Sequence, residues 1–180
     1  MRILGVNGIH NWSWSDSSFT DHFLDALSDE CVVVDIKYQR MTAFLAYFSY
    51  FRKRVAKKIL KEAKETDCIV AHSFGCLATI EAINMGLKVD KIFFFGAAAE
   101  REAEFSDDGF NRLYNIHSES DTALGLGKKL PWHKFGTMGK DGYIGTSPKV
   151  VNVAVDGLGH NDYVTPKNLC IWTKFIKERL

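Results

Sequence analysis

The chain lacks a long apolar run, internal repeats, low-complexity tracts and any appreciable net charge. No apolar run approaches the roughly 20 residues that cross a bilayer. The N-terminal segment is too short for a signal peptide and enters a strand pattern at once, so we expect a cytoplasmic protein without a transmembrane segment. The formal net charge of +1 argues neither for nor against a nucleic-acid partner.

Cysteine is also scarce, and its placement does not suggest a metal site. The four cysteines lie far apart in the chain, without the spacing of metal ligands: Cys31, Cys68, Cys76 and Cys170. We interpret them as buried free thiols in a reducing compartment. No metal ion and no organic cofactor is expected.

Strand and helix patterns alternate along the chain, which is long enough for one domain, residues 1–180, with a sizeable core. Short apolar runs predict six strands, at 3–6, 31–36, 68–72, 91–95, 113–117 and 150–155. Amphipathic stretches predict helices at 17–27, 41–65, 74–85 and 165–179. Strands that alternate with helices imply an α/β fold, a three-layer α/β/α domain with a six-stranded, mostly parallel sheet.

One connection is long for a compact domain. Residues 122–149 contain six glycines and the aromatic residues Trp132, Phe135 and Tyr143. Loops of this length are usually functional or disordered, and the aromatic residues argue against plain disorder. We therefore interpret this glycine-rich excursion as a candidate lid.

The most informative residues are 71–75, Ala-His-Ser-Phe-Gly, which lie between a predicted strand and a predicted helix. This arrangement is the G-x-S-x-G nucleophile elbow, with Ala71 in the first glycine position. The strained turn pushes the Ser73 hydroxyl outward. Small flanking residues are needed because the helix folds back against the strand at once, and alanine still meets that need.

A serine hydroxyl becomes a good nucleophile only when a base removes its proton and a carboxylate orients that base. In the fold that this elbow implies, the order along the chain is serine, acid, histidine, each after a different strand. Asp121 follows the strand at 113–117, and His160 follows the strand at 150–155. We therefore predict Ser73, Asp121 and His160 as the catalytic residues.

Other acids and histidines compete for these roles. The rival acids are Asp107, Asp108 and Glu119, and also Asp162, which is too near His160 in sequence to reach its far ring nitrogen and is interpreted as a loop stabiliser. His72, one residue before the nucleophile on a strand, should point to the other side and pack as a structural residue. His22 lies on a predicted helix, and His133 lies in the glycine-rich excursion.

Acyl transfer also needs two backbone N–H donors aimed at the developing oxyanion. The residue after the nucleophile, Phe74, should supply one of them. The loop after the first strand should supply the other, and Ile9, just past Gly8, is the candidate. The candidate substrate-lining residues are His10, Trp12 and Leu124.

Together these features resemble a small α/β-hydrolase without a cap domain, similar to compact bacterial lipases and esterases. The resemblance covers nearly the whole chain, from Asn7-Gly8-Ile9 to the last predicted helix, although many members have His-Gly where this chain has Asn7-Gly8. It implies that Ser73, Asp121 and His160 are nucleophile, acid and base. The partner it implies is a small-molecule acyl ester or thioester, with no nucleic acid involved.

The sequence leaves the chemistry partly open. The first hypothesis is a serine hydrolase that cleaves an ester or thioester through an acyl-enzyme on Ser73, in a shallow cleft. An amidase or peptidase would use the same three residues and differ only in the leaving group. A third hypothesis, a binding protein with an idle triad, follows from the rule that fold does not fix function.

Overall fold

The computed structural model describes residues 2–8, 27, 32–35, 49–127 and 135–180. Within them a six-stranded sheet has the order β2-β1-β3-β4-β5-β6. Every neighbouring pair of strands is parallel. The strands are β1 (Arg2–Val6), β2 (Val32–Asp35), β3 (Cys68–His72), β4 (Val89–Phe95), β5 (Phe110–His117) and β6 (Val150–Ala154). The predicted α/β fold class is confirmed.

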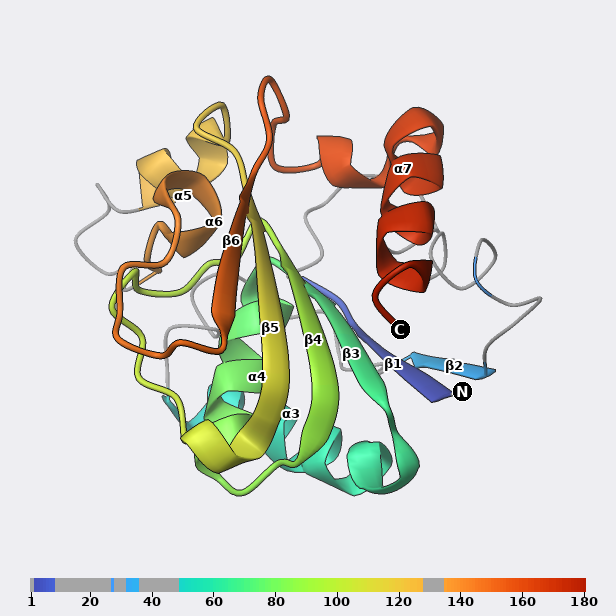
Figure 1. Ribbon diagram of the computed structural model, residues 1–180. Helices are drawn as coiled ribbons and strands as arrows, with labels where there is room; N and C mark the ends of the chain where they lie inside the picture. Colours follow the sequence, from blue (N-terminus) through green and yellow to red (C-terminus); the bar gives the residue numbers. More distant parts are fainter. Residues whose placement is uncertain (1, 9–26, 28–31, 36–48, 128–134) are drawn as a thin grey trace.

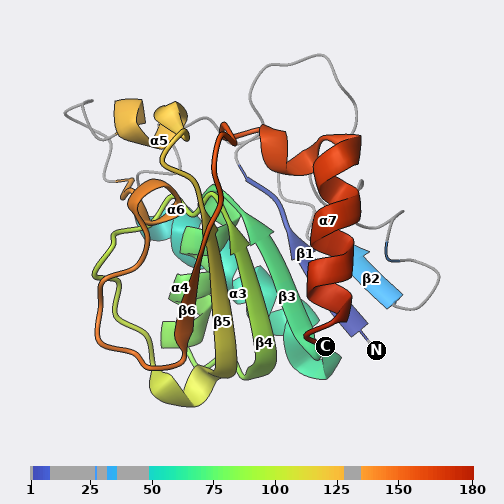
Figure 2. The same cartoon turned by 45° about the horizontal axis from the view of Figure 1, so that its top comes forward.

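Helices cover both faces of the sheet (Figure 1). On one face lie α3 (Ser49–Glu62) and α4 (Phe74–Asn84), and on the other lies α7 (Pro166–Lys177), as the turned view also shows (Figure 2). Of the predicted helix at 17–27 only Leu27 is described, and the first part of the predicted helix at 41–65 also lies outside the described residues.

The side chains of each central strand alternate between two cores. Phe94 packs with α3 and α4, whereas its neighbours Phe93 and Phe95 pack with Trp172 and Ile176 of α7. A parallel strand buried on both faces reads as an unbroken apolar run, which is why β4 was recognisable in the sequence. The start of β5 was missed because exposed polar residues interrupt its apolar positions there.

The glycine-rich excursion is more regular than predicted. It contains α5 (Thr122–Gly127) and α6 (Met138–Asp141), and the latter packs against the loop that follows β4 (Figure 1). The Gly139 amide donates to the Ala97 carbonyl at 2.8 Å, and the Met138 amide donates to the Ala99 carbonyl at 2.9 Å. These bonds join α6 to the loop after β4, and the lid at 122–149 stays a prediction.

The structure also tests the predicted burial of the cysteines. Cys76 of α4 and Cys68 of β3 are buried as predicted, but Cys170 of α7 is exposed. Cys31 lies outside the described residues. Thr165 directly precedes α7, and its hydroxyl donates to the Asp162 carbonyl and does not cap the helix.

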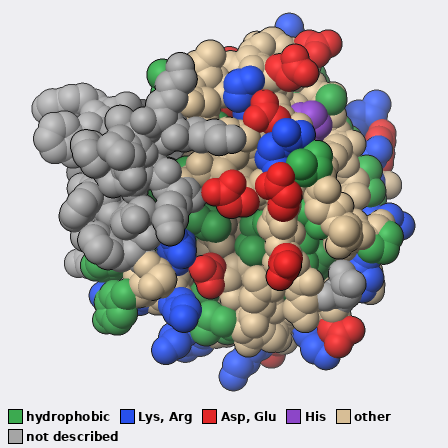
Figure 3. Space-filling view, turned by 90° about the vertical axis from the view of Figure 1, so that its left-hand side faces the viewer, with side chains coloured by type: hydrophobic (Ala, Val, Ile, Leu, Met, Phe, Trp, Pro, Cys, Tyr) green, Lys and Arg blue, Asp and Glu red, His purple; other side chains and the backbone are tan. Residues whose placement is uncertain are grey.

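Charge is unevenly distributed over the surface. The outer face of α3 exposes Lys53, Arg54, Lys57, Lys58 and Lys61, whereas the loop between β4 and β5 exposes Glu100, Glu102, Glu104 and Asp108. Figure 3 shows acidic side chains gathered on the side of the molecule that this loop covers. The small net charge is thus a balance between separate regions. No helix among the described residues is long and apolar enough to cross a membrane.

Candidate active site

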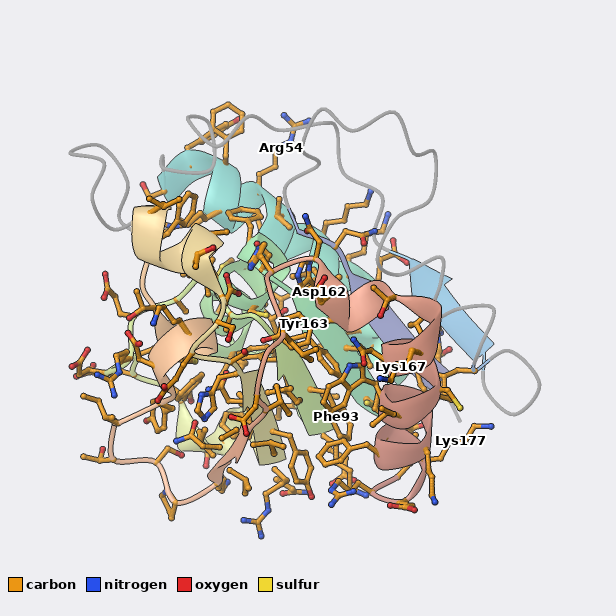
Figure 4. The ribbon with its side chains drawn as sticks, turned by 90° about the horizontal axis from the view of Figure 1, so that it is seen from above. Arg54, Phe93, Asp162, Tyr163, Lys167 and Lys177 are labelled. Atoms are coloured by element: carbon orange, nitrogen blue, oxygen red, sulfur yellow. The ribbon has the colours of Figure 1, made fainter. Side chains whose placement is uncertain are left out.

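The candidate site lies at the carboxyl edge of the sheet, where the strand order reverses. The chain leaves β1 toward β2 but leaves β3 toward β4, so the loops after these two neighbouring strands diverge. Open parallel sheets bind ligands at such a point. Figure 4 looks down on this edge, where Asp162 and Tyr163 lie in the segment that leads into α7. The loop after β1 approaches closely, since a methyl group on Gly8 would lie 2.9 Å from Ser73 Cβ.

Ser73 occupies the strained turn that the sequence predicts. Its φ of 55° and ψ of −121° make it the one non-glycine residue with positive φ in the described part of the chain. Such strain persists only where the surroundings hold it. The Ser73 amide donates to the Phe95 carbonyl at 3.0 Å, and its carbonyl accepts from the Ala98 amide at 3.2 Å. A side chain on Gly75 would overlap the Val6 carbonyl, which explains the glycine there.

The structure brings the three predicted residues into one hydrogen-bonded chain. His160 Nε2 lies 2.8 Å from Ser73 Oγ, and His160 Nδ1 lies 2.7 Å from Asp121 Oδ2. The Asp121 side chain is fully buried, while that of His160 is 16% exposed. With the neutral ring protonated on Nδ1, the serine hydroxyl donates to Nε2 and Nδ1–H donates to the carboxylate. This is the geometry that general-base activation of a serine requires.

Asp121 is held from two sides. Its amide donates to the Ser118 carbonyl at 2.9 Å, and its Oδ1 accepts the Leu124 amide at 3.3 Å, a capping contact at the start of α5. Ser118 in turn donates its amide to the Gly139 carbonyl. Ser118 thus links Asp121 to α6. The glycine-rich excursion therefore helps to position the acid through this helix.

The rival acids lie elsewhere. Asp107 and Asp108 belong to a short 3-10 turn that precedes β5. They therefore lie at the amino end of this strand, whereas the candidate site lies at the carboxyl end. Glu119 is exposed. Asp162 Oδ2 accepts the Gly159 amide at 2.7 Å, so this carboxylate stabilises the loop that carries the histidine, as its closeness in sequence indicated.

Gly96, for which no role was predicted, lies beneath the acid and the base. A methyl group there would be 3.2 Å from Asp121 Oδ2 and 3.3 Å from His160 Nδ1. The residue also has a positive φ of 53°. The Asp121–His160 pair therefore passes over the end of β4 at a point where a side chain would press on both partners.

His72 is buried as predicted, but it is not remote from the site. Its Nε2 lies 2.9 Å from the His160 carbonyl oxygen, and the two rings are 4.8 Å apart. Because a carbonyl only accepts, Nε2 must carry the proton. Burial first, and the neighbouring His160 second, lower the pKa of His72 to about 3, so the ring is neutral near pH 7.

His72 should make the stability of the protein depend on pH. The unfolded histidine takes up a proton near pH 6.5, whereas the folded one stays neutral down to about pH 3. The unfolded state therefore binds more protons in this window, so the free energy of unfolding falls as the pH drops below 6.5. We expect His72→Gln to remove up to about 1.4 kcal/mol per pH unit of this slope, measured by urea unfolding between pH 5 and 6.5. Equal slopes in both proteins would contradict it.

The remaining predicted site residues divide into two groups. Phe74 is fully buried at the start of α4, and Leu124 is buried on α5. Ile9, His10 and Trp12 lie outside the described residues, so their predicted roles stay predictions. Among the described residues no three or more His, Cys, Asp or Glu side chains form a group that could hold a metal ion.

Comparison with known proteins identifies the fold. No family model and no curated protein sequence matches the chain. A candidate hydrolase of the alpha/beta superfamily from Xanthomonas campestris matches with a TM-score of 0.60 at 6% identity, over 98% of both chains. The esterase domain of a Rhodothermus marinus protein matches with a TM-score of 0.62 at 12% identity, over 99% of this chain and 84% of that one.

A gene product from Listeria innocua gives a similar result. Its TM-score is 0.58 at 13% identity, and the match covers 99% of this chain and 94% of that one. At such low identities these likenesses bear on architecture alone. The chain therefore has the compact α/β-hydrolase fold that its sequence motifs predict. The matches to these structures cover nearly its whole length.

Proposed function

We propose that the protein is a serine hydrolase that cleaves a carboxylic ester or thioester through an acyl-enzyme on Ser73. The observation that carries this proposal is the unbroken chain of contacts from Ser73 Oγ through His160 to Asp121 Oδ2, at 2.8 and 2.7 Å. The three side chains come from turns after three different strands. The serine also sits in a strained conformation that a merely structural residue would not need.

In the first half of the reaction His160 acts as base. Ser73 Oγ attacks the substrate carbonyl carbon while its proton passes to His160 Nε2, and the carbonyl π electrons move onto oxygen. The buried carboxylate of Asp121 stabilises the imidazolium through the proton on Nδ1. Collapse of the tetrahedral intermediate breaks the bond to the alcohol or thiol, which leaves with the proton from Nε2.

In the second half water replaces the leaving group. His160 removes a proton from the water, whose oxygen attacks the acyl carbon, and the Ser73–acyl bond then breaks as Oγ regains its proton. Atoms and charges balance within these residues, so the scheme needs no redox partner.

The oxyanion would be bound by backbone amides. Phe74 is the first residue of α4, and the N-terminus of a helix carries partial positive charge that favours an anion. The loop beyond Gly8 would supply a second donor, with Ile9 as the predicted residue. The closeness of Gly8 to Ser73 Cβ supports this assignment, since it brings the loop after β1 to the nucleophile.

An ester or thioester is the proposed substrate because one similar structure is an esterase domain, and because no cap domain is inserted within the part of the chain that the structure describes. The same triad could cleave an amide, with the amine accepting its proton from His160. The competing class is a binding protein that holds this arrangement idle.

A fluorophosphonate probe tests the proposal directly. The probe should form a covalent bond to Ser73 Oγ, located by peptide mass spectrometry, and Ser73→Ala and His160→Ala should lose the label while they retain the native circular dichroism spectrum. A panel of p-nitrophenyl esters of rising acyl length, a matching thioester series and an anilide series would then identify the bond cleaved. Absence of labelling on folded wild-type protein would overturn the proposal and favour the binding protein.

A further inference from the structure

We propose that His72 is a positioning residue for the catalytic base, because it holds the main chain of His160 at the distance that lets the ring reach Ser73. This inference rests on the proposed serine hydrolase function. This role differs from the predicted packing role. It requires that Nε2 of the His72 ring face the His160 carbonyl.

The strand register brings the two histidines together. Ala71 of β3 faces the core beneath α4, so His72, the last residue of the strand, faces the α7 side. The loop from β6 into α7 crosses the sheet on that same side and carries His160 to Ser73. His72 therefore lies next to this loop, and the Tyr163 ring of the same segment is 6.2 Å from the His72 ring.

The loop that carries His160 includes two glycines, which have no side chain to pack. They are Gly157, with a φ of 73°, and Gly159. Three hydrogen bonds hold this loop next to the base. The Gly159 amide donates to Asp162 Oδ2, the Asp162 amide donates to the Gly159 carbonyl, and His72 Nε2–H donates to the His160 carbonyl. Of these, only the bond from His72 acts on the base residue itself. A displacement of about 1 Å in a reacting group can cost roughly 100-fold in rate.

The opposite edge of the same ring faces the loop after β1. A methyl group on Gly8 would lie 3.3 Å from His72 Nδ1, so the imidazole lies between the proposed oxyanion loop and the base loop. The buried His72 side chain thus lies against both the loop after β1 and the loop that carries His160. Both loops must keep their positions relative to Ser73. A hydrocarbon side chain would fill this space but would not hold the carbonyl.

The His72 ring must also stay uncharged, because a charge on it would destabilise the protonated form of His160. A positive charge on His72, with ring centres 4.8 Å apart, would oppose formation of the imidazolium on His160. Burial keeps His72 neutral, so it can donate a hydrogen bond without electrostatic penalty. Lysine or arginine could also donate to the carbonyl, but each would bring the charge that the base must avoid.

Two variants separate positioning from packing. His72→Leu fills similar space without a donor, whereas His72→Gln keeps an N–H donor. We expect His72→Leu to slow the second-order rate of fluorophosphonate labelling by about 10- to 100-fold, with kcat for an ester lowered and KM unchanged. His72→Gln should recover most of the loss. In a His160→Ala background, where labelling is lost, His72→Leu should change the residual rate of ester hydrolysis by less than about 2-fold, because positioning acts only through the His160 ring.

A second measurement does not depend on activity. The nitrogen-bound proton on His160 Nδ1, followed by NMR on protein with 15N-labelled histidine, should shift in His72→Leu and return toward the wild-type position in His72→Gln. A wild-type labelling rate and an unmoved resonance in His72→Leu would overturn the inference. Equal rate losses with and without His160 would also overturn it, since they indicate packing alone. If wild-type protein takes no label but the resonance still moves, the proposed function fails and the contact stands.

Discussion

Replacing Asp121 by asparagine is expected to lower turnover about 10⁴-fold while the fold stays intact. The carboxylate oxygen Oδ2 only accepts, so it keeps the His160 proton on Nδ1 and leaves Nε2 free to take the serine proton. An asparagine can keep the Leu124 amide on Oδ1, but its amide nitrogen would donate to Nδ1. The histidine proton would then move to Nε2, and the base could no longer accept from Ser73.

The measurement is steady-state hydrolysis of the best ester from the substrate panel, with circular dichroism and thermal unfolding as checks on folding. Asp162→Asn is the matched control, because this carboxylate lies two residues from His160 and its contact with the Gly159 amide can be kept by an amide oxygen. It should retain turnover within a few-fold. If Asp162→Asn or Asp108→Asn caused the large loss and Asp121→Asn did not, the acid would be wrongly assigned.

Replacing Gly139 by alanine is expected to destabilise the protein by about 3 kcal/mol or more. A methyl group on Gly139 would overlap the backbone nitrogen of Ala97. Neither segment can give way cheaply, because the Gly139 amide donates to the Ala97 carbonyl and its own carbonyl accepts the Ser118 amide. The second bond supports the turn that presents Asp121, so turnover should fall along with stability.

Urea unfolding gives the free energy for this variant. Gly125→Ala, in the other short helix of the same excursion, is the matched control, because a methyl group there would meet only the end of the Lys140 side chain at 3.6 Å. Alanine favours a helix over glycine, so this variant should be unchanged or slightly more stable. Similar stabilities for the two variants would show that α6 is not fixed against the loop after β4.

Much of the fold could be predicted because its signals are local. The buried parts of the central strands are short apolar runs, and the predicted bounds of β3 match the observed Cys68–His72. The order serine, acid, histidine then singled out Ser73, Asp121 and His160 as candidates, and the structure places these three within hydrogen-bonding distance. Strand ends were less certain, since the exposed residues at the start of β5 resemble a loop in composition.

Contacts between distant segments could not be predicted in the same way. The roles of Gly96 and Gly139 depend on which backbone passes within a few ångströms of them, and no local pattern encodes that distance. His72 was predicted on the correct face of its strand, with a purely structural packing role there. In fact the His160 loop reaches Ser73 from that face.

The sequence by itself determined the strand–turn–helix at Ser73, the alternation of strands and helices, and three candidate residues at strand ends, because periodicity, small residues and chain order are local properties. Only the tertiary structure decided which acid contacts the histidine, how the excursion at 122–149 is anchored and that His72 holds the His160 carbonyl. These depend on how parallel strands and their loops pack in space, where residues 39 or 88 positions apart come within hydrogen-bonding distance.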